Sequence, residues 1–127
     1  MMYSDTVRAR FMQPQFAGTL EGEQVLQARV GAQEQGAVME IYIALDAHRV
    51  QAARFKAYGC GACIATADYL CELLVGMPID QLEQFDTQPL IAALDLTGIK
   101  LHCAWLASEV TEQLWLAWRQ LEASLTH

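Results

Sequence analysis

Positive charge is scarce in this chain. Its 8 lysines and arginines stand against 15 aspartates and glutamates, which gives a formal net charge of −7. The basic residues are scattered along the sequence, so no extended face could neutralise a phosphate backbone. The composition therefore argues against a nucleic-acid-binding protein and predicts a solvated acidic surface.

Long apolar runs are also absent, although 54% of the residues are hydrophobic. A membrane-spanning helix needs about 20 consecutive apolar residues, and no segment comes near that length. The first residues, "MMYSDTVRARF", lack the apolar core of a secretory signal. We therefore expect a cytoplasmic protein that does not associate with membranes. In that compartment thiols stay reduced, so the four cysteines predict metal binding, sulfur chemistry or core packing rather than disulfides.

The apolar pattern predicts one domain over residues 1–127. A short helix capped by Ser4, with Val7 and Phe11 on its inward face, and an irregular connection over 12–23 precede a small sheet. Apolar residues alternate over 24–30, 39–45 and 50–58, and short connections join these segments. Three consecutive strands with such connections form an antiparallel meander. The alternation slips in the third segment, which indicates a β-bulge near Ala53.

From Gly61 onward the apolar period changes from two residues to 3.6, which predicts helices. Two short helices are expected over 79–85 and 87–94, followed by a loop over 95–102. A long amphipathic C-terminal helix is expected from Cys103 onward. Strands followed by helices predict an α+β fold, with the helices packed on one face of the three-stranded antiparallel meander.

The segment "YGCGAC" at 58–63 places two thiols at a metal-ligand or redox spacing. Cys60 lies between two glycines at the junction of a predicted strand and helix, which leaves room around its sulfur. Cys63 follows one helical turn later, so both sulfurs could approach one point. The unpaired amides and the dipole of a helix N-terminus favour thiolate there. Cys71 lies on the apolar stripe of the same helix and is predicted to be a core residue.

The segment "KLHC" at 100–103 supplies a second group of candidate ligands. His102 and Cys103 can both turn toward one site if they lie at a loop–helix junction, but not if the segment is regular helix. If the two segments converge, Cys60, Cys63, His102 and Cys103 form a Cys3His set. Such a set suits tetrahedral zinc or an iron–sulfur centre.

Several segments together resemble one known family. They include "YSDTV" at 3–7, "ARFKAYGCGACIA" at 53–65 and "KLHC" at 100–103. Over nearly its whole length the chain resembles the IscU/NifU-type iron–sulfur cluster assembly scaffolds. The resemblance implies a compact α+β domain that acts as a carrier rather than as a turnover enzyme.

The same resemblance implies partners, cargo and site residues. Members of the family accept sulfur from a cysteine desulfurase, build a [2Fe–2S] cluster and transfer it to recipient apo iron–sulfur proteins; some related members bind Zn²⁺ instead. Carried over by motif, Cys60, His102 and Cys103 are site residues, and Cys103 is the expected persulfide acceptor.

The chain departs from the family pattern at two places. Gln35 and Ala37 stand where the family has the cysteine and the aspartate of a Cys-Gly-Asp segment. A neutral amide is a poor ligand for iron in a thiolate-rich site, so Cys63, where the family does not ordinarily have a cysteine, is the candidate replacement. The family's Leu-Pro-Pro-Val-Lys segment is "LTGIK" at 96–100. Loss of both prolines removes its extended character and argues against recognition by the dedicated Hsp70-type chaperone.

Two other functions remain open at this point. A degenerate paralogue could bind and modulate a cysteine desulfurase or a true scaffold without holding a cluster, and the missing Cys-Gly-Asp favours it. A dithiol redox enzyme could use Cys60 and Cys63, but a redox C-x-x-C ordinarily opens a helix in a βαβ setting, which this sequence lacks.

Overall fold

The computed structural model describes residues 3–125. Its main elements in chain order are α1 (Asp5–Met12), β1 (Val25–Ala32), β2 (Ala37–Asp46), β3 (Arg49–Tyr58), α2 (Gly61–Leu74), α3 (Gln88–Leu94) and α4 (Leu101–Leu125). Three short 3-10 turns lie between them: η1 (Gln33–Gln35), η2 (Ile79–Gln84) and η3 (Gly98–Lys100). The predicted α+β fold, with its antiparallel meander and long C-terminal helix, is confirmed.

The three strands form one antiparallel sheet in the order β1–β2–β3. The buried residues of β1 lie opposite those of β2, as in the pair of Leu26 with Ile43. A further short stretch reaches the free edge of β3, where the Phe55 N–H donates to the Phe16 carbonyl at 2.9 Å. The segment after α1, expected to be irregular, therefore contributes a parallel bridge at Ala17.

The predicted bulge in the third strand exists, but it lies two residues before Ala53. Ala44 is opposite Ala52 and Leu45 is opposite Val50, so Gln51 is the extra residue. This insertion explains the change of parity along β3, because Val50 is buried before the bulge and Ala53 is buried after it.

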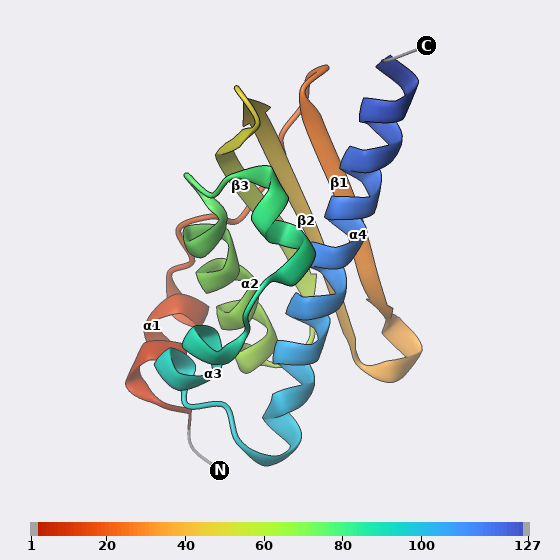
Figure 1. Ribbon diagram of the computed structural model, residues 1–127. Coiled ribbons are helices and arrows are strands. Elements are labelled where there is room, and N and C mark those ends of the chain that lie inside the picture. The colour runs from red at the N-terminus through yellow and green to blue at the C-terminus, as the bar shows by residue number, and fades with distance from the viewer. Residues whose placement is uncertain (1–2, 126–127) are drawn as a thin grey trace.

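The helices lie on one side of the sheet, as Figure 1 shows: α4 runs along β1, α2 packs against β3, and α1 and α3 pack on α2. The core lies between the two layers. It includes Ile41 and Ile43 from β2, Leu70 from α2, and Val110 and Leu114 from α4, all fully buried. None of the helices within residues 3–125 has the length and apolar character needed to cross a membrane.

Helix α4 begins at Leu101, two residues earlier than predicted. The η3 turn closes when the Lys100 N–H donates to the Thr97 carbonyl at 3.0 Å, and the helix follows it directly. The loop predicted over 95–102 is therefore wrong at its end, and His102 and Cys103 both lie in the first turn of a regular helix.

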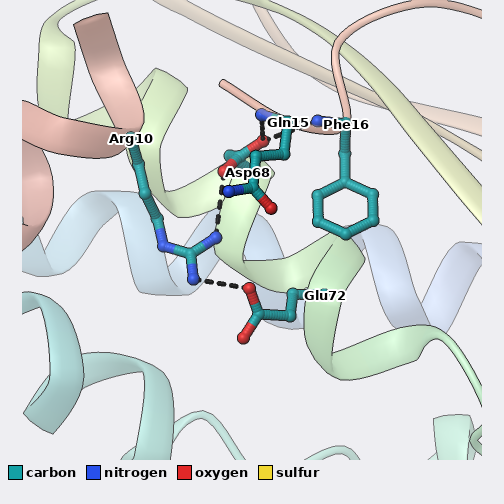
Figure 2. A network of polar contacts seen from close by, with 5 residues as sticks. All are labelled: Arg10, Gln15, Phe16, Asp68 and Glu72. Atoms are coloured by element: carbon teal, nitrogen blue, oxygen red, sulfur yellow. Dashed lines mark hydrogen bonds and ion pairs between the residues drawn. The ribbon is translucent and has the colours of Figure 1, made fainter. Parts of the chain in front are cut away.

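A buried carboxylate holds α1 and the segment after it on α2. Asp68 is fully buried; its Oδ2 accepts from the Arg10 guanidinium at 2.9 Å, and its Oδ1 accepts from the backbone N–H groups of Gln15 and Phe16, each at 2.8 Å. Arg10 also donates to Glu72 at 2.6 Å. Figure 2 shows Arg10 reaching both carboxylates. We call this set of contacts the Asp68 clasp.

Candidate functional site

The β1–β2 connection and the junction of β3 with α2 lie against each other at one end of the molecule. Gly59 has a φ of +143°, and a Cβ at this position would lie 3.1 Å from the Gly36 carbonyl oxygen and 3.4 Å from the Ala37 Cβ. Only glycine allows this torsion and this backbone contact. The segment in which the family has Cys-Gly-Asp therefore lies beside the Cys60 loop.

Cys60 is the N-cap residue of α2. Its carbonyl accepts the N–H groups of Cys63 at 3.0 Å and Ile64 at 3.2 Å, which are the first hydrogen bonds of the helix. The Cys60 side chain is exposed, whereas Cys63, one turn further along, is fully buried. The two thiols of "YGCGAC" thus differ sharply in access.

The N-terminal segment covers the start of α2 beside Cys60. The Gly61 N–H donates to the Tyr3 hydroxyl at 3.2 Å, and Lys100 Nζ lies 5.3 Å from the centroid of the Tyr3 ring. A Cβ at Gly61 would lie 2.9 Å from the Tyr3 ring and 3.1 Å from the Phe11 ring. Two aromatic rings therefore close directly over the first residue of α2.

The thiols of Cys60, Cys63 and Cys103 form one group, which we call the thiol cluster. The Cys103 side chain lies within interaction distance of those of Cys63, Cys60 and Thr66, and it is only 3% exposed. The hydrogen bond from Cys103 lowers the pKa of Cys63. The pKa of Cys103 is raised by this hydrogen bond and by burial. Within the pair, the proton is therefore held more tightly by Cys103 than by Cys63.

His102 lies outside the thiol cluster. Its exposed side chain lines a groove of about 580 Å³ together with Ile99 and Trp105, which are 92% and 77% exposed. Successive residues of an α-helix point about 100° apart, so the buried Cys103 and the exposed His102 face different directions. The structure brings together three of the four predicted ligands and leaves the imidazole on the neighbouring groove.

The donor set of the thiol cluster suits a soft metal, because three thiolates could be supplied from two helices. Within residues 3–125, no group of three or more His, Cys, Asp or Glu side chains is arranged so that it could hold a metal ion as it stands. A fourth ligand from His102 would require the first turn of α4 to open. The predicted ligand roles of Cys60, Cys63, His102 and Cys103 remain predictions.

The positions that depart from the family pattern differ in their surroundings. Gln35 is exposed on the η1 turn, whereas Ala37 is 7% exposed and packs against Gly59. A methyl group therefore fills the place in which the family has an aspartate. The altered "LTGIK" segment contains the η3 turn rather than an extended strand.

Cys71 lies in the core, as predicted. It is fully buried on α2, and burial together with the nearby Asp68 charge raises its pKa. The sequence interpretation did not include Thr66, which contacts Cys103 and whose hydroxyl donates to the Ala62 carbonyl at 2.7 Å. Its spacing of three residues from Cys63 on the same helix was the available signal.

Comparison with known proteins decides the family. The model of the NifU-like N-terminal domain matches residues 2–122. The chain belongs to the NifU-like N-terminal domain family. The iron–sulfur cluster assembly scaffold protein IscU of Escherichia coli K12 is 32% identical over 112 residues, covering 86% of this chain and 88% of that protein. The iron–sulfur cluster assembly protein IscU of Plasmodium falciparum is 30% identical over 109 residues, covering 84% of this chain and 67% of that protein.

Solved structures agree on the fold of this NifU-like chain. A protein of Fervidobacterium islandicum described as an iron–sulfur cluster assembly scaffold for the SUF system superposes with a TM-score of 0.68 at 17% identity, covering 89% of this chain and 96% of that one. A NifU-like N-terminal protein of Brucella abortus gives 0.67 at 12% identity, covering 94% of each chain. The scaffold family predicted from the sequence is confirmed, and the relatives support the predicted role in cluster assembly.

Proposed function

We propose that this chain is an iron–sulfur cluster assembly scaffold that receives sulfur from a cysteine desulfurase. It holds a [2Fe–2S] cluster as cargo and passes it to recipient apo-proteins. The observation that carries the proposal is the meeting of three thiols from α2 and α4 at one end of a scaffold-family fold, with one of them open to solvent.

The role is that of a carrier. Sulfur arrives when a thiolate of the chain attacks the persulfide of the desulfurase, and the protein then positions that sulfur beside iron. Cys60 is the exposed thiol of the thiol cluster and the one that a large donor can reach. Its exposure favours Cys60 over the buried Cys103 as the first acceptor, although the sequence predicts Cys103.

The ligands proposed for the cluster are the sulfurs of Cys60, Cys63 and Cys103. Cys63 would then replace the thiolate that Gln35 cannot supply. His102 completes the set if the first turn of α4 unwinds when the cargo binds. The same donors would hold a single Zn²⁺, which prefers four tetrahedral nitrogen or sulfur ligands.

Anaerobic reconstitution tests the proposal. The protein is supplied with ferrous iron, cysteine and a cysteine desulfurase, and the visible charge-transfer absorption of a cluster is followed together with acid-labile sulfide. We expect both signals in the parent chain and in the Cys71→Ala control. A chain that acquires neither cluster nor zinc, but still binds the desulfurase in a pull-down, would instead support the modulating paralogue.

A further inference from the structure

Access divides the thiol cluster into one open sulfur and two closed ones. Cys60 is exposed at the start of α2, whereas Cys63 is fully buried and Cys103 is 3% exposed. A sulfur donor as large as a desulfurase can therefore meet Cys60 without opening the fold. Cys63 can react only with a sulfur that has already entered the thiol cluster.

Cys60 and Cys63 are also placed to form a disulfide within one helical turn. The Cys63 N–H donates to the Cys60 carbonyl at 3.0 Å, so the two residues span the first turn of α2. Residues three apart in a helix have Cα atoms about 5 Å apart, which lies within the range of disulfides. Cys103 also contacts both of these thiols, but it comes from α4, so a bridge from Cys60 to Cys103 would join two helices, whereas the Cys60–Cys63 bridge stays within one turn.

These two observations point to a role for Cys63, the thiol that the family pattern does not include. Resting on the proposed sulfur-accepting function, we propose that Cys63 resolves a persulfide formed on Cys60 and releases its outer sulfur as sulfide. The chain would then supply the electrons for one round of sulfide production itself, at the place where iron is to be bound.

The chemistry balances in two steps. The Cys60 thiolate attacks the outer sulfur of the desulfurase persulfide, which leaves the desulfurase as thiolate and Cys60 as a persulfide. The Cys63 thiolate then attacks Cys60 Sγ, the S–S bond of the persulfide breaks, and HS⁻ leaves with the electron pair. The persulfide sulfur is reduced by two electrons, and the two thiols are oxidised to a Cys60–Cys63 disulfide.

Burial of Cys63 gives this reaction its selectivity. A fully buried thiol is protected from solution thiols and oxidants, so it stays reduced until a persulfide forms next to it. The resulting disulfide has one sulfur on the exposed residue Cys60, where an external dithiol reductant can attack and restore both thiols.

A single-turnover experiment tests the proposal. A cysteine desulfurase is loaded with persulfide, freed of cysteine and mixed anaerobically with the reduced chain in the presence of a metal chelator and without reductant. Free sulfide is measured colorimetrically, and persulfides and disulfides are located by peptide mass spectrometry. The variants are Cys63→Ala and the control Cys71→Ala, which removes a buried thiol from the same helix outside the thiol cluster.

The parent and Cys71→Ala are expected to release sulfide and to form the Cys60–Cys63 disulfide. In Cys63→Ala the extra sulfur is expected to remain on Cys60, and sulfide release should fall by about tenfold or more. After dithiothreitol has reduced the disulfide and has been removed, the parent should release sulfide again when freshly loaded desulfurase is added.

Equal sulfide release from Cys63→Ala and the parent would overturn the proposal, as would a disulfide that involves Cys103. A stable Cys60 persulfide in the parent would overturn the resolving step alone, because sulfur acceptance would still stand. Absence of transferred sulfur from every variant, Cys63→Ala included, would overturn the proposed function together with this step.

Discussion

Helix α2 contributes to two groups of polar side chains, the Asp68 clasp at its middle and the thiol cluster at its start, and the buried members of the two groups have different kinds of partner. In the clasp, a buried carboxylate meets a guanidinium and two backbone N–H groups, so each oxygen of Asp68 is satisfied by a donor from another segment. In the thiol cluster, Cys63 Sγ donates to the Tyr58 carbonyl at 3.9 Å, and the thiols otherwise lie against one another.

The difference in partners indicates a structural role for the Asp68 clasp and a chemical role for the thiol cluster, although both involve residues of α2. A buried charge with complete partners is costly to disturb and leaves nothing to react. Thiols that lie in contact with one another, with one of them exposed to solvent, can exchange a proton or a sulfur atom without breaking the contacts that stabilise the fold. We therefore expect the clasp to control stability and the thiol cluster to control sulfur and metal chemistry.

Replacing the clasp carboxylate should have the largest effect on stability. Asp68→Ala leaves two backbone N–H groups and part of the Arg10 guanidinium without their acceptor, and we expect a loss of about 3–5 kcal/mol in the free energy of unfolding. Urea denaturation measures this loss. The matched control is Glu72→Gln, which alters the exposed partner of Arg10 and should cost less than about 1 kcal/mol. Equal losses in the two variants would contradict the distinction between the buried and exposed partners.

Alkaline pH should reveal the contribution of the buried Cys71 thiol to stability. Burial raises the pKa of Cys71 in the folded chain. Below the ordinary thiol pKa of about 8.5 both states keep the proton, and above it only the unfolded thiol ionises. This single group should therefore reduce stability by up to about 1.4 kcal/mol per pH unit above that value.

The check is the slope of unfolding free energy against pH between about 8.5 and 10. Cys71→Ala should show a shallower decline than the parent, whatever its stability at neutral pH. Parallel slopes would show that the Cys71 thiol ionises as easily in the folded chain as in the unfolded one.

The contact between the N-terminal segment and the start of α2 should show a smaller effect. Gly61→Ala would push a methyl group against the Tyr3 and Phe11 rings, and we expect a loss of about 1–2 kcal/mol in unfolding free energy. Tyr3→Phe keeps the ring and removes only the hydroxyl that accepts from Gly61, so about 1 kcal/mol is expected. If Gly61→Ala is as stable as the parent, the two rings do not close over this residue in solution.

The smallest effect is expected at His102. His102→Ala changes an exposed side chain on the groove, so the unfolding free energy should change by less than about 0.5 kcal/mol. Zinc affinity, measured by competition with a chromogenic chelator, tests its predicted ligand role at the same time. Unchanged affinity would fix the imidazole in its outward position, whereas a clear loss would show that the first turn of α4 rearranges around the metal.

The sequence predicted the layers of the fold because its apolar periods agree with the buried faces. Leu26 and Ile43 follow a two-residue period and meet across the sheet, and Leu114 follows the helical period of α4. The apolar period does not determine the exact start of α4. The 3-10 turn at Gly98–Lys100 leads directly into the helix, and no capping side chain marks the first helical residue. That difference of two residues turns His102 away from Cys103.

The candidate site was predictable where spacing alone determines contact. Cys60 and Cys63 fall on one turn of helix, and the family motif pairs Cys60 with Cys103. The Asp68 clasp was not predictable, because its partners lie 52 to 58 residues away in sequence and only the packing of α1 on α2 brings them together. Tyr3 likewise contacts Gly61 across 58 residues.

Metal content tests the central claim most directly, namely that Cys60, Cys63 and Cys103 serve one site. Iron and zinc are measured by elemental analysis in protein purified without oxygen, for the parent, Cys63→Ser and Cys71→Ser. We predict that Cys63→Ser loses most of the bound metal while Cys71→Ser, an equally buried change on the same helix, retains it. Full retention of metal in Cys63→Ser would contradict the claim.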